Sequence, residues 1–192
     1  MDARLRHLRY ICDGGGTESS RDRIFVEMVI GLLTASLLSI ICFLYTAWLG
    51  FTVHGPAGIG HHFLYGFFTT FLVTLAQSMT MFFFIGTGKQ VKDLIGKDEK
   101  GPDFIKRTKQ FKAKTFPPML WAMLLTMATM IVGGGVHTQV LPAFHLAVIH
   151  GLLATAALYY NLVATWRNAR YMVEHNMLMA EVEARLVASA SK

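Results

Sequence analysis

The chain contains few charged residues. Asp, Glu, Lys and Arg together make up 16% of its 192 residues, whereas a soluble globular domain carries about 25%. The shortage is local, because residues 28–88 and 115–166 contain no charged side chain other than histidine. Hydrophobic residues reach 53% and the mean hydropathy is +0.42. This composition excludes a soluble enzyme and a disordered chain, and it indicates an integral membrane protein.

Cysteine is also scarce. Cys12 lies in a polar N-terminal segment and Cys42 in the middle of an apolar one, so we expect two free thiols and no disulfide framework. The chain has no Cys-x-x-Cys-His motif, which excludes a covalently attached c-type haem of the usual kind.

Each uncharged block is about long enough for two membrane crossings, since one helix needs about 20 apolar residues. Glycine and proline mark the ends of these crossings, so we predict spans at about 24–53, 62–88, 116–134 and 142–166. The marks are His54-Gly55-Pro56, Gly86-Thr87-Gly88, Phe116-Pro117-Pro118, Gly133-Gly134-Gly135 and Pro142. Inside a bilayer every backbone amide must be paired within its own segment. The predicted fold class is therefore all-α, an integral membrane four-helix bundle over residues 24–166.

The basic residues indicate the orientation of the bundle. All 18 Lys and Arg lie in an N-terminal arm (1–23), a basic inner loop (89–114) or a C-terminal helical tail (167–192). Basic segments stay on the cytoplasmic side, so we predict a multi-pass protein of the cell inner (cytoplasmic) membrane with both termini cytoplasmic. The net charge of +6 is then a topology signal, and no nucleic-acid partner is expected because no aromatic-interleaved basic fold accompanies it.

The cytoplasmic segments suggest contacts with lipid and with other proteins. Residues 103–114 mix aromatic and basic side chains, which is typical either of a stretch in the headgroup layer of the lipid bilayer or of a solvated loop. The tail keeps helical spacing in its apolar residues and is expected to continue the fourth helix. Its apolar face predicts a partner subunit or a second copy of the chain. We find no repeat of fixed period in the sequence.

Histidine is the residue type that carries most information about function. Of the eight histidines, His7 and His175 lie in the inner polar segments. The predicted topology puts the other six on the outer side or in the outer half of the membrane: His54, His61, His62, His137, His145 and His150. Those outer segments contain no Asp, Glu, Lys or Arg, so histidine is the main ionisable residue there.

Helical rotation separates these histidines. At about 100° per residue, His150 shares a face with small residues of the fourth span, and His145 lies about 140° away. His62 lies at the margin of a polar stripe on the second span, with His61 on the opposite side. Polar residues in a span face the bundle interior, so we expect His62 and His150 to point inward. Two interpretations stay open: close packing of small helix faces, or a planar cofactor with axial histidine ligands.

The cofactor interpretation predicts one b-type haem near the outer surface, with His62 and either His150 or His145 as axial ligands. A bare copper, zinc or iron site is the alternative, with His137, His145 and His150 and with His54 or His61 as further ligands. The layout of four spans with outer-end histidines resembles the haem-bearing anchor subunits of respiratory complexes. That resemblance implies an electron-transfer subunit of a redox membrane complex, with contact to a quinone as a further possibility. The competing hypothesis is a cofactor-free structural or assembly subunit that joins other membrane subunits or a second copy through its small helix faces.

Overall fold

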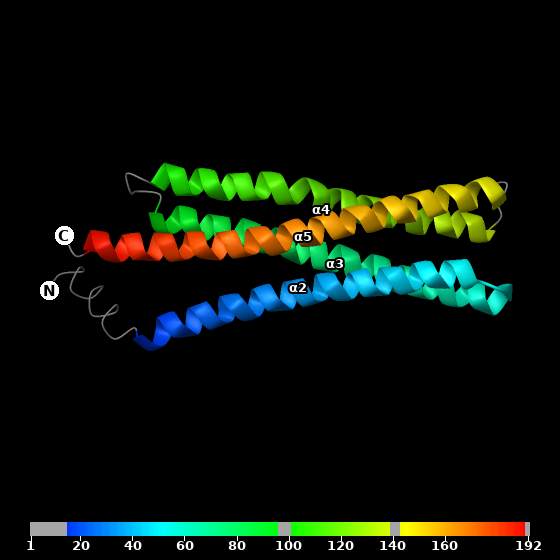
Figure 1. Ribbon diagram of the computed structural model, residues 1–192, viewed down its shortest axis with the longest axis horizontal. Helices are drawn as coiled ribbons and strands as arrows, with labels where there is room; N and C mark the ends of the chain where they lie inside the picture. The colour runs from blue at the N-terminus through cyan, green and yellow to red at the C-terminus, as the bar shows by residue number, and fades with distance from the viewer. Residues whose placement is uncertain (1–14, 96–100, 139–142, 191–192) are drawn as a thin grey trace.

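Four long helices form an antiparallel bundle (Figure 1). The computed structural model describes residues 15–95, 101–138 and 143–190. Its helices are α2 (Gly15–Thr52), α3 (Gly55–Ile95), α4 (Gly101–Thr138) and α5 (Ala143–Ala190). Neighbours along the chain are neighbours in space, α5 also contacts α2, and α3 faces α5 across the centre. The predicted all-α four-helix bundle is confirmed.

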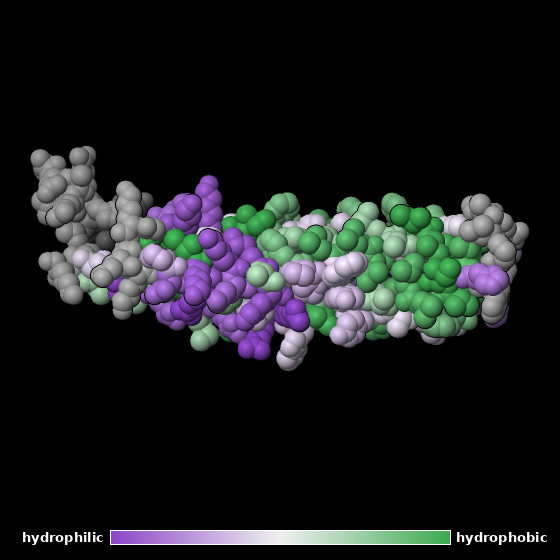
Figure 2. Space-filling view, turned by 90° about the horizontal axis from the view of Figure 1, so that it is seen from above, coloured by the Kyte–Doolittle hydropathy of each residue, from purple (hydrophilic) through white to green (hydrophobic). Residues whose placement is uncertain are grey.

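All four helices are long and apolar enough to cross a membrane, which confirms the prediction of a multi-pass membrane protein. The helices are also longer than a bilayer requires. With 41 residues, α3 extends over about 60 Å, twice the ~30 Å of a hydrocarbon core. Figure 2 shows hydrophilic side chains gathered over the end of the bundle where α2 begins and α5 ends, and apolar ones over the other end. We call these the charged end and the apolar end.

The predicted inner loop over 89–114 is wrong for most of its length. Residues 89–95 continue α3 and residues 101–114 belong to α4, while 96–100 lie outside the described residues. Phe111 is buried and Phe104 packs on the same core, so residues 103–114 run along the bundle rather than flat in the headgroup layer. The N-terminal arm is similarly shorter than predicted, since α2 begins at Gly15; residues 1–14 lie outside the described part of the chain.

Pro117 and Pro118 lie inside α4, so the prediction that they open the third helix is wrong. A proline nitrogen has no hydrogen to donate to the carbonyl four residues earlier. The carbonyl that Pro118 leaves without its helical donor is that of Lys114. The guanidinium of Arg167 on α5 donates to this oxygen at 3.2 Å, which replaces the missing bond and lets the helix continue.

The two turns at the apolar end also differ from one another. The turn predicted at His54-Gly55-Pro56 is confirmed, because α2 ends at Thr52 and α3 begins at Gly55, whose φ of +68° suits glycine. The turn predicted at Gly133-Gly134-Gly135 is wrong, since α4 runs on to Thr138.

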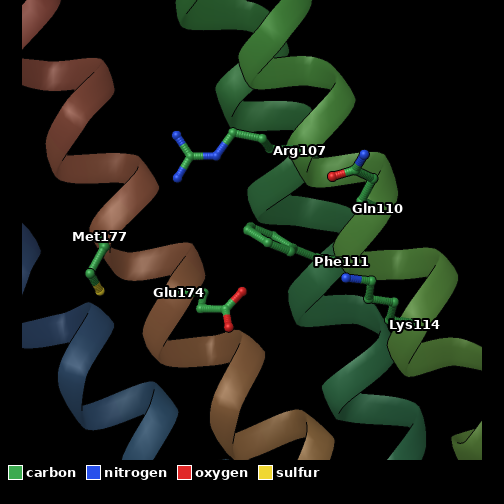
Figure 3. Close-up of a pocket in the computed structure, with 6 residues that line it drawn as sticks. All are labelled: Arg107, Gln110, Phe111, Lys114, Glu174 and Met177. Carbon is green, nitrogen blue, oxygen red and sulfur yellow. The ribbon is translucent and has the colours of Figure 1, made fainter.

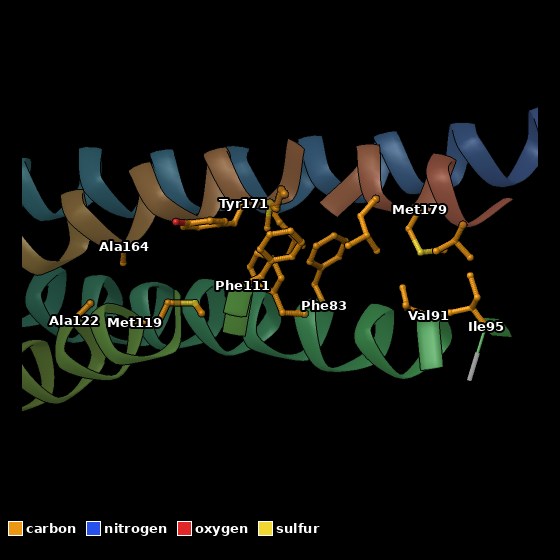
Figure 4. Close-up of a cluster of buried hydrophobic side chains, with 14 residues drawn as sticks. Phe83, Val91, Ile95, Phe111, Met119, Ala122, Ala164, Tyr171 and Met179 are labelled. Carbon is orange, nitrogen blue, oxygen red and sulfur yellow. The ribbon is translucent and has the colours of Figure 1, made fainter. Parts of the chain in front are cut away.

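The core of the charged end is built from all four helices (Figure 4). Phe83, Phe111 and Tyr171 meet at its centre, and Phe25 of α2 contacts Phe83 with ring centroids 5.4 Å apart. The tail continues α5 as predicted. Its apolar face packs against helices of the same chain through the residues Met172, Leu178, Met179, Val182 and Leu186.

Candidate cofactor site

The structure brings His62 of α3 and His150 of α5 together at the apolar end of the bundle. Their ring centroids lie 6.0 Å apart and their ring planes are inclined at 85°. Both side chains are half-buried. The sequence prediction that these two histidines point inward from facing helices matches this geometry.

Each imidazole is held by a backbone carbonyl of the preceding helix. His62 Nδ1 lies 3.1 Å from the carbonyl oxygen of Thr46 on α2, and His150 Nδ1 lies 3.0 Å from that of Thr129 on α4. A carbonyl oxygen only accepts, so Nδ1 must be the donor in both pairs. In a neutral imidazole this leaves the lone pair on Nε2, the nitrogen that is then available to bind a metal.

Each imidazole also packs against a glycine one turn after that threonine. A Cβ added at Gly50 would lie 3.0 Å from Cε1 of His62, and one added at Gly133 would lie 2.8 Å from Cε1 of His150. At Gly133 this is closer than non-bonded carbon atoms approach, and at Gly50 it is tighter than an ordinary contact. A side chain at either position would therefore displace the imidazole or the helix beside it.

The two halves of the site repeat one arrangement. Threonine and glycine four positions apart on one helix hold a histidine on the next, as Thr46, Gly50 and His62 and again as Thr129, Gly133 and His150. The sequence separation between His62 and His150 also relates buried residues of α3 to buried residues of α5. The pairs with this separation are Thr69 and Ala157, Val73 and Asn161, Ala76 and Ala164, Thr80 and Asn168, Phe84 and Met172, and Val91 and Met179.

The sequence has no repeat of fixed period, yet the arrangement of threonine, glycine and histidine recurs in the two hairpins, α2 with α3 and α4 with α5. The threonine-to-histidine interval is five positions longer in the second hairpin than in the first. The segments that connect the two helices of each hairpin therefore differ in length. No single period can align α2 with α4 and also α3 with α5. The bundle consists of two helical hairpins, α2 with α3 and α4 with α5, and each contributes one histidine to the pair.

The spacing of the two rings suits one metal atom between them. Two imidazoles on opposite sides of a metal have ring centres about 6 Å apart, since each nitrogen lies about 2 Å from the metal and about 1 Å from its ring centre. Two protein ligands are too few for a typical zinc or copper site. They suffice for a haem iron, because the porphyrin supplies the remaining nitrogens.

The other predicted ligands are not gathered at this pair. His54, His61 and His145 are exposed, and the side chain of His137 lies outside the described part of the structure. Among the described residues, no group of three or more His, Cys, Asp or Glu side chains could hold a metal ion. His150 rather than His145 faces His62, so the described geometry favours the pair His62 and His150.

A second polar cluster lies deeper in the bundle. Asn168 Nδ2 donates to Gln77 Oε1 at 3.2 Å, and Gln77 Nε2 donates to Asn161 Oδ1 at 3.5 Å. Asn161 Nδ2 in turn donates to Thr126 Oγ1 at 3.2 Å. All four side chains are buried. These bonds tie α3, α4 and α5 together in the way expected for polar groups that pack between membrane helices.

His175 is buried, which its polar type and its place outside the predicted spans do not indicate. This side chain is 1% exposed at the charged end, beyond Trp166 at the end of the predicted fourth span. Neither ring nitrogen has a hydrogen-bond partner among the described residues. Burial, together with the charge of Lys112, lowers the pKa of His175 to about 4. Phe83, Phe84 and Phe111 surround the ring with centroids 5.9–6.3 Å away. The helical spacing of position 175 could have indicated this burial, because His175 continues the apolar stripe of Met172, Met179 and Val182.

Comparisons of the chain with family models, with curated proteins and with solved structures gave no match.

Proposed function

We propose that this chain is a small integral-membrane subunit of a redox, respiratory-type membrane complex, and that His62 and His150 hold one b-type haem between α3 and α5. The observation that carries the proposal is the pair of facing imidazoles, 6.0 Å between centroids, each with Nδ1 on a carbonyl. Metal-binding histidines donate their second nitrogen in this way, which fixes the ring and raises its basicity.

The chain's own groups would perform three tasks in such a subunit. The Nε2 atoms of His62 and His150 provide two neutral ligands. The carbonyls of Thr46 and Thr129 hold both rings in the tautomer that binds metal. Gly50 and Gly133 let the rings approach the neighbouring helices. A bound haem would supply the one-electron redox step.

The position of the pair limits the route of electrons. If the basic residues face the cytoplasm, the histidine pair lies near the outer surface. At the charged end His175 has no second imidazole within ring-contact distance among the described side chains. One centre near the outer surface would exchange electrons with a quinol or an outer partner, and it would not carry them across the bilayer alone.

Absorption spectroscopy of the purified protein, before and after dithionite, tests this proposal. We expect a Soret band, sharpened α and β bands on reduction, and about one haem per chain, since each chain has one pair of histidines that would hold it. His62→Ala and His150→Ala should remove the band, while His61→Ala and His145→Ala should retain it. Absence of a Soret band from the purified protein, with or without other bound metal, would contradict the proposal.

The geometry also favours a second candidate, a cofactor-free structural or assembly subunit. Each Nδ1 bond joins adjacent helices, His62 joining α3 to α2 and His150 joining α5 to α4, so the histidines could serve packing alone. In that case His62→Ala and His150→Ala would weaken assembly of the complex and leave every spectrum unchanged. A complex that still assembles but has lost its absorbance would exclude this second candidate.

A further inference from the structure

A cavity of about 320 Å³ lies between α4 and α5 at the charged end (Figure 3). Arg107, Gln110, Phe111 and Lys114 line it from α4, and Glu174 and Met177 line it from α5. The cavity has no part in the proposed haem site, which lies at the apolar end of the bundle.

The cavity lies at the depth of lipid headgroups. Lys114 is the last charged residue before the uncharged block 115–166, and Arg167, which bonds its carbonyl, is the first one after it. These two residues mark the boundary of the hydrocarbon region. Arg107 lies two helical turns further out, about 10 Å, while the headgroup layer on each side of a bilayer is about 5–8 Å thick. The cavity therefore covers the headgroup layer from its inner to its outer limit.

The charges that line the cavity do not cancel. Arg170 Nε donates to Glu174 at 2.9 Å, and Arg107 pairs with Glu181. Lys114 has no carboxylate within 4 Å among the described side chains, and its ammonium lies 5.5 Å from the ring centroid of Tyr171. One lysine thus contributes a positive charge that no acidic residue of the described chain neutralises.

We propose that this cavity binds the phosphodiester headgroup of a phospholipid that carries one negative charge, such as phosphatidylglycerol. The ammonium of Lys114 pairs with the phosphodiester, and the amide of Gln110 provides a further donor beside it. Phe111 and Met177 form an apolar floor for the glycerol backbone. A zwitterionic headgroup fits less well, because its ammonium group needs a free carboxylate and Glu174 is already paired with Arg170.

Native mass spectrometry of the full-length protein in detergent tests this proposal. Phosphatidylglycerol and phosphatidylethanolamine with the same acyl chains are titrated in parallel, and we expect tighter binding of phosphatidylglycerol. Lys114→Met should weaken phosphatidylglycerol binding about fivefold, the factor that one cation contributes near an anionic lipid surface. The matched control is Lys109→Met, an exposed lysine of the same helix outside the cavity, which should leave the affinity unchanged.

Two outcomes would overturn the proposal. One is equal binding of the two lipids to the unaltered protein, and the other is an equal loss in Lys114→Met and Lys109→Met. Soluble glycerol phosphate serves as a competitor: displacement of the lipid by it at equal concentration would indicate a site for free phosphate instead. Circular dichroism of both variants checks that the helices are intact, and the readout is independent of any haem.

Discussion

At the scale of single residues, the position of the His150 ring depends on the absence of a side chain at Gly133. Gly133→Ala would put a methyl group 2.8 Å from Cε1 of His150, so the ring has to shift, and we expect the shift to disturb its hydrogen bond to the Thr129 carbonyl. Loss of such a supporting bond typically weakens metal affinity 10- to 100-fold. We expect a corresponding loss of haem, measured as Soret absorbance per protein during a haem titration.

The neighbouring glycine provides the control for this experiment. A Cβ at Gly134 would meet no atom within 4 Å, so Gly134→Ala should keep the haem affinity of the unaltered protein. Equal losses in the two variants would mean that the effect comes from the helix backbone and not from contact with the imidazole.

His175 leads to a prediction about pH. Its pKa is about 4 in the folded protein and about 6.5 in an unfolded chain, so between these values the unfolded state binds more protons. The free energy of unfolding should therefore fall as the pH decreases from 6.5 to 4, by about 3 kcal/mol in total. His175→Leu removes both the titration and two unpartnered buried nitrogens. Denaturation midpoints at pH 7.5 and pH 4.5 should differ strongly in the unaltered protein and little in the variant. If the midpoint changes by the same amount in both proteins, the lowered pKa of His175 is not the cause of the pH dependence.

These residues show what the sequence could and could not reveal. The inward position of His62 and His150 followed from helical rotation and from the preference of polar residues for a bundle interior. The roles of Gly50 and Gly133 did not follow, because a glycine in an apolar span has many possible functions until its neighbour on the next helix is known. His175 was overlooked for a related reason: it is polar in type, but its place in the stripe is that of a core residue.

At the scale of helical elements, Pro118 and Arg167 form a pair whose coupling can be measured. Arg167 supplies Lys114 with the hydrogen bond that Pro118 cannot form. Because Arg167 is exposed, Arg167→Met should destabilise the protein by only about 1 kcal/mol. In a Pro118→Ala background the amide of residue 118 bonds the same carbonyl, so Arg167→Met should have almost no effect.

A double-mutant cycle of thermal or denaturant unfolding provides the measurement. Arg170→Met is the control, since Arg170 bonds Glu174 on its own helix and should show no coupling to Pro118. Additive effects of Arg167→Met and Pro118→Ala would show that the two residues act independently.

Helix ends were the least predictable part of the fold. The prolines at 117 and 118 and the glycines at 133–135 are residue types that usually end helices, yet α4 continues through both. Arg167 compensates for one of the carbonyls that the prolines leave unpaired, and Gly133 provides room for His150. In each case the side chain that interacts with α4, Arg167 or His150, lies on α5, so the sequence around the prolines and glycines does not reveal it.

At the scale of the whole molecule, two similar hairpins form one bundle, and the candidate site lies where their equivalent helices face each other. A ligand bound there receives one histidine from each half. This explains why neither hairpin alone carries a recognisable motif: each contributes only a threonine, a glycine and a histidine, on two separate helices. The overall architecture was nevertheless predictable, because long uncharged blocks in a membrane permit few structures other than helices.

The orientation of the bundle decides on which side of the membrane the histidine pair lies. Basic segments remain cytoplasmic, so the turn between α2 and α3 should lie outside and the end of α5 inside. In a background with Cys12 and Cys42 replaced by serine, Ala57→Cys and Ser189→Cys each introduce a thiol at an exposed position. A membrane-impermeant maleimide should label Ala57→Cys in spheroplasts with intact membranes, and Ser189→Cys only after lysis. The reverse pattern would leave the bundle and its histidine pair unchanged but would move the proposed redox centre to the cytoplasmic surface, so its electron partner would have to be a cytoplasmic one.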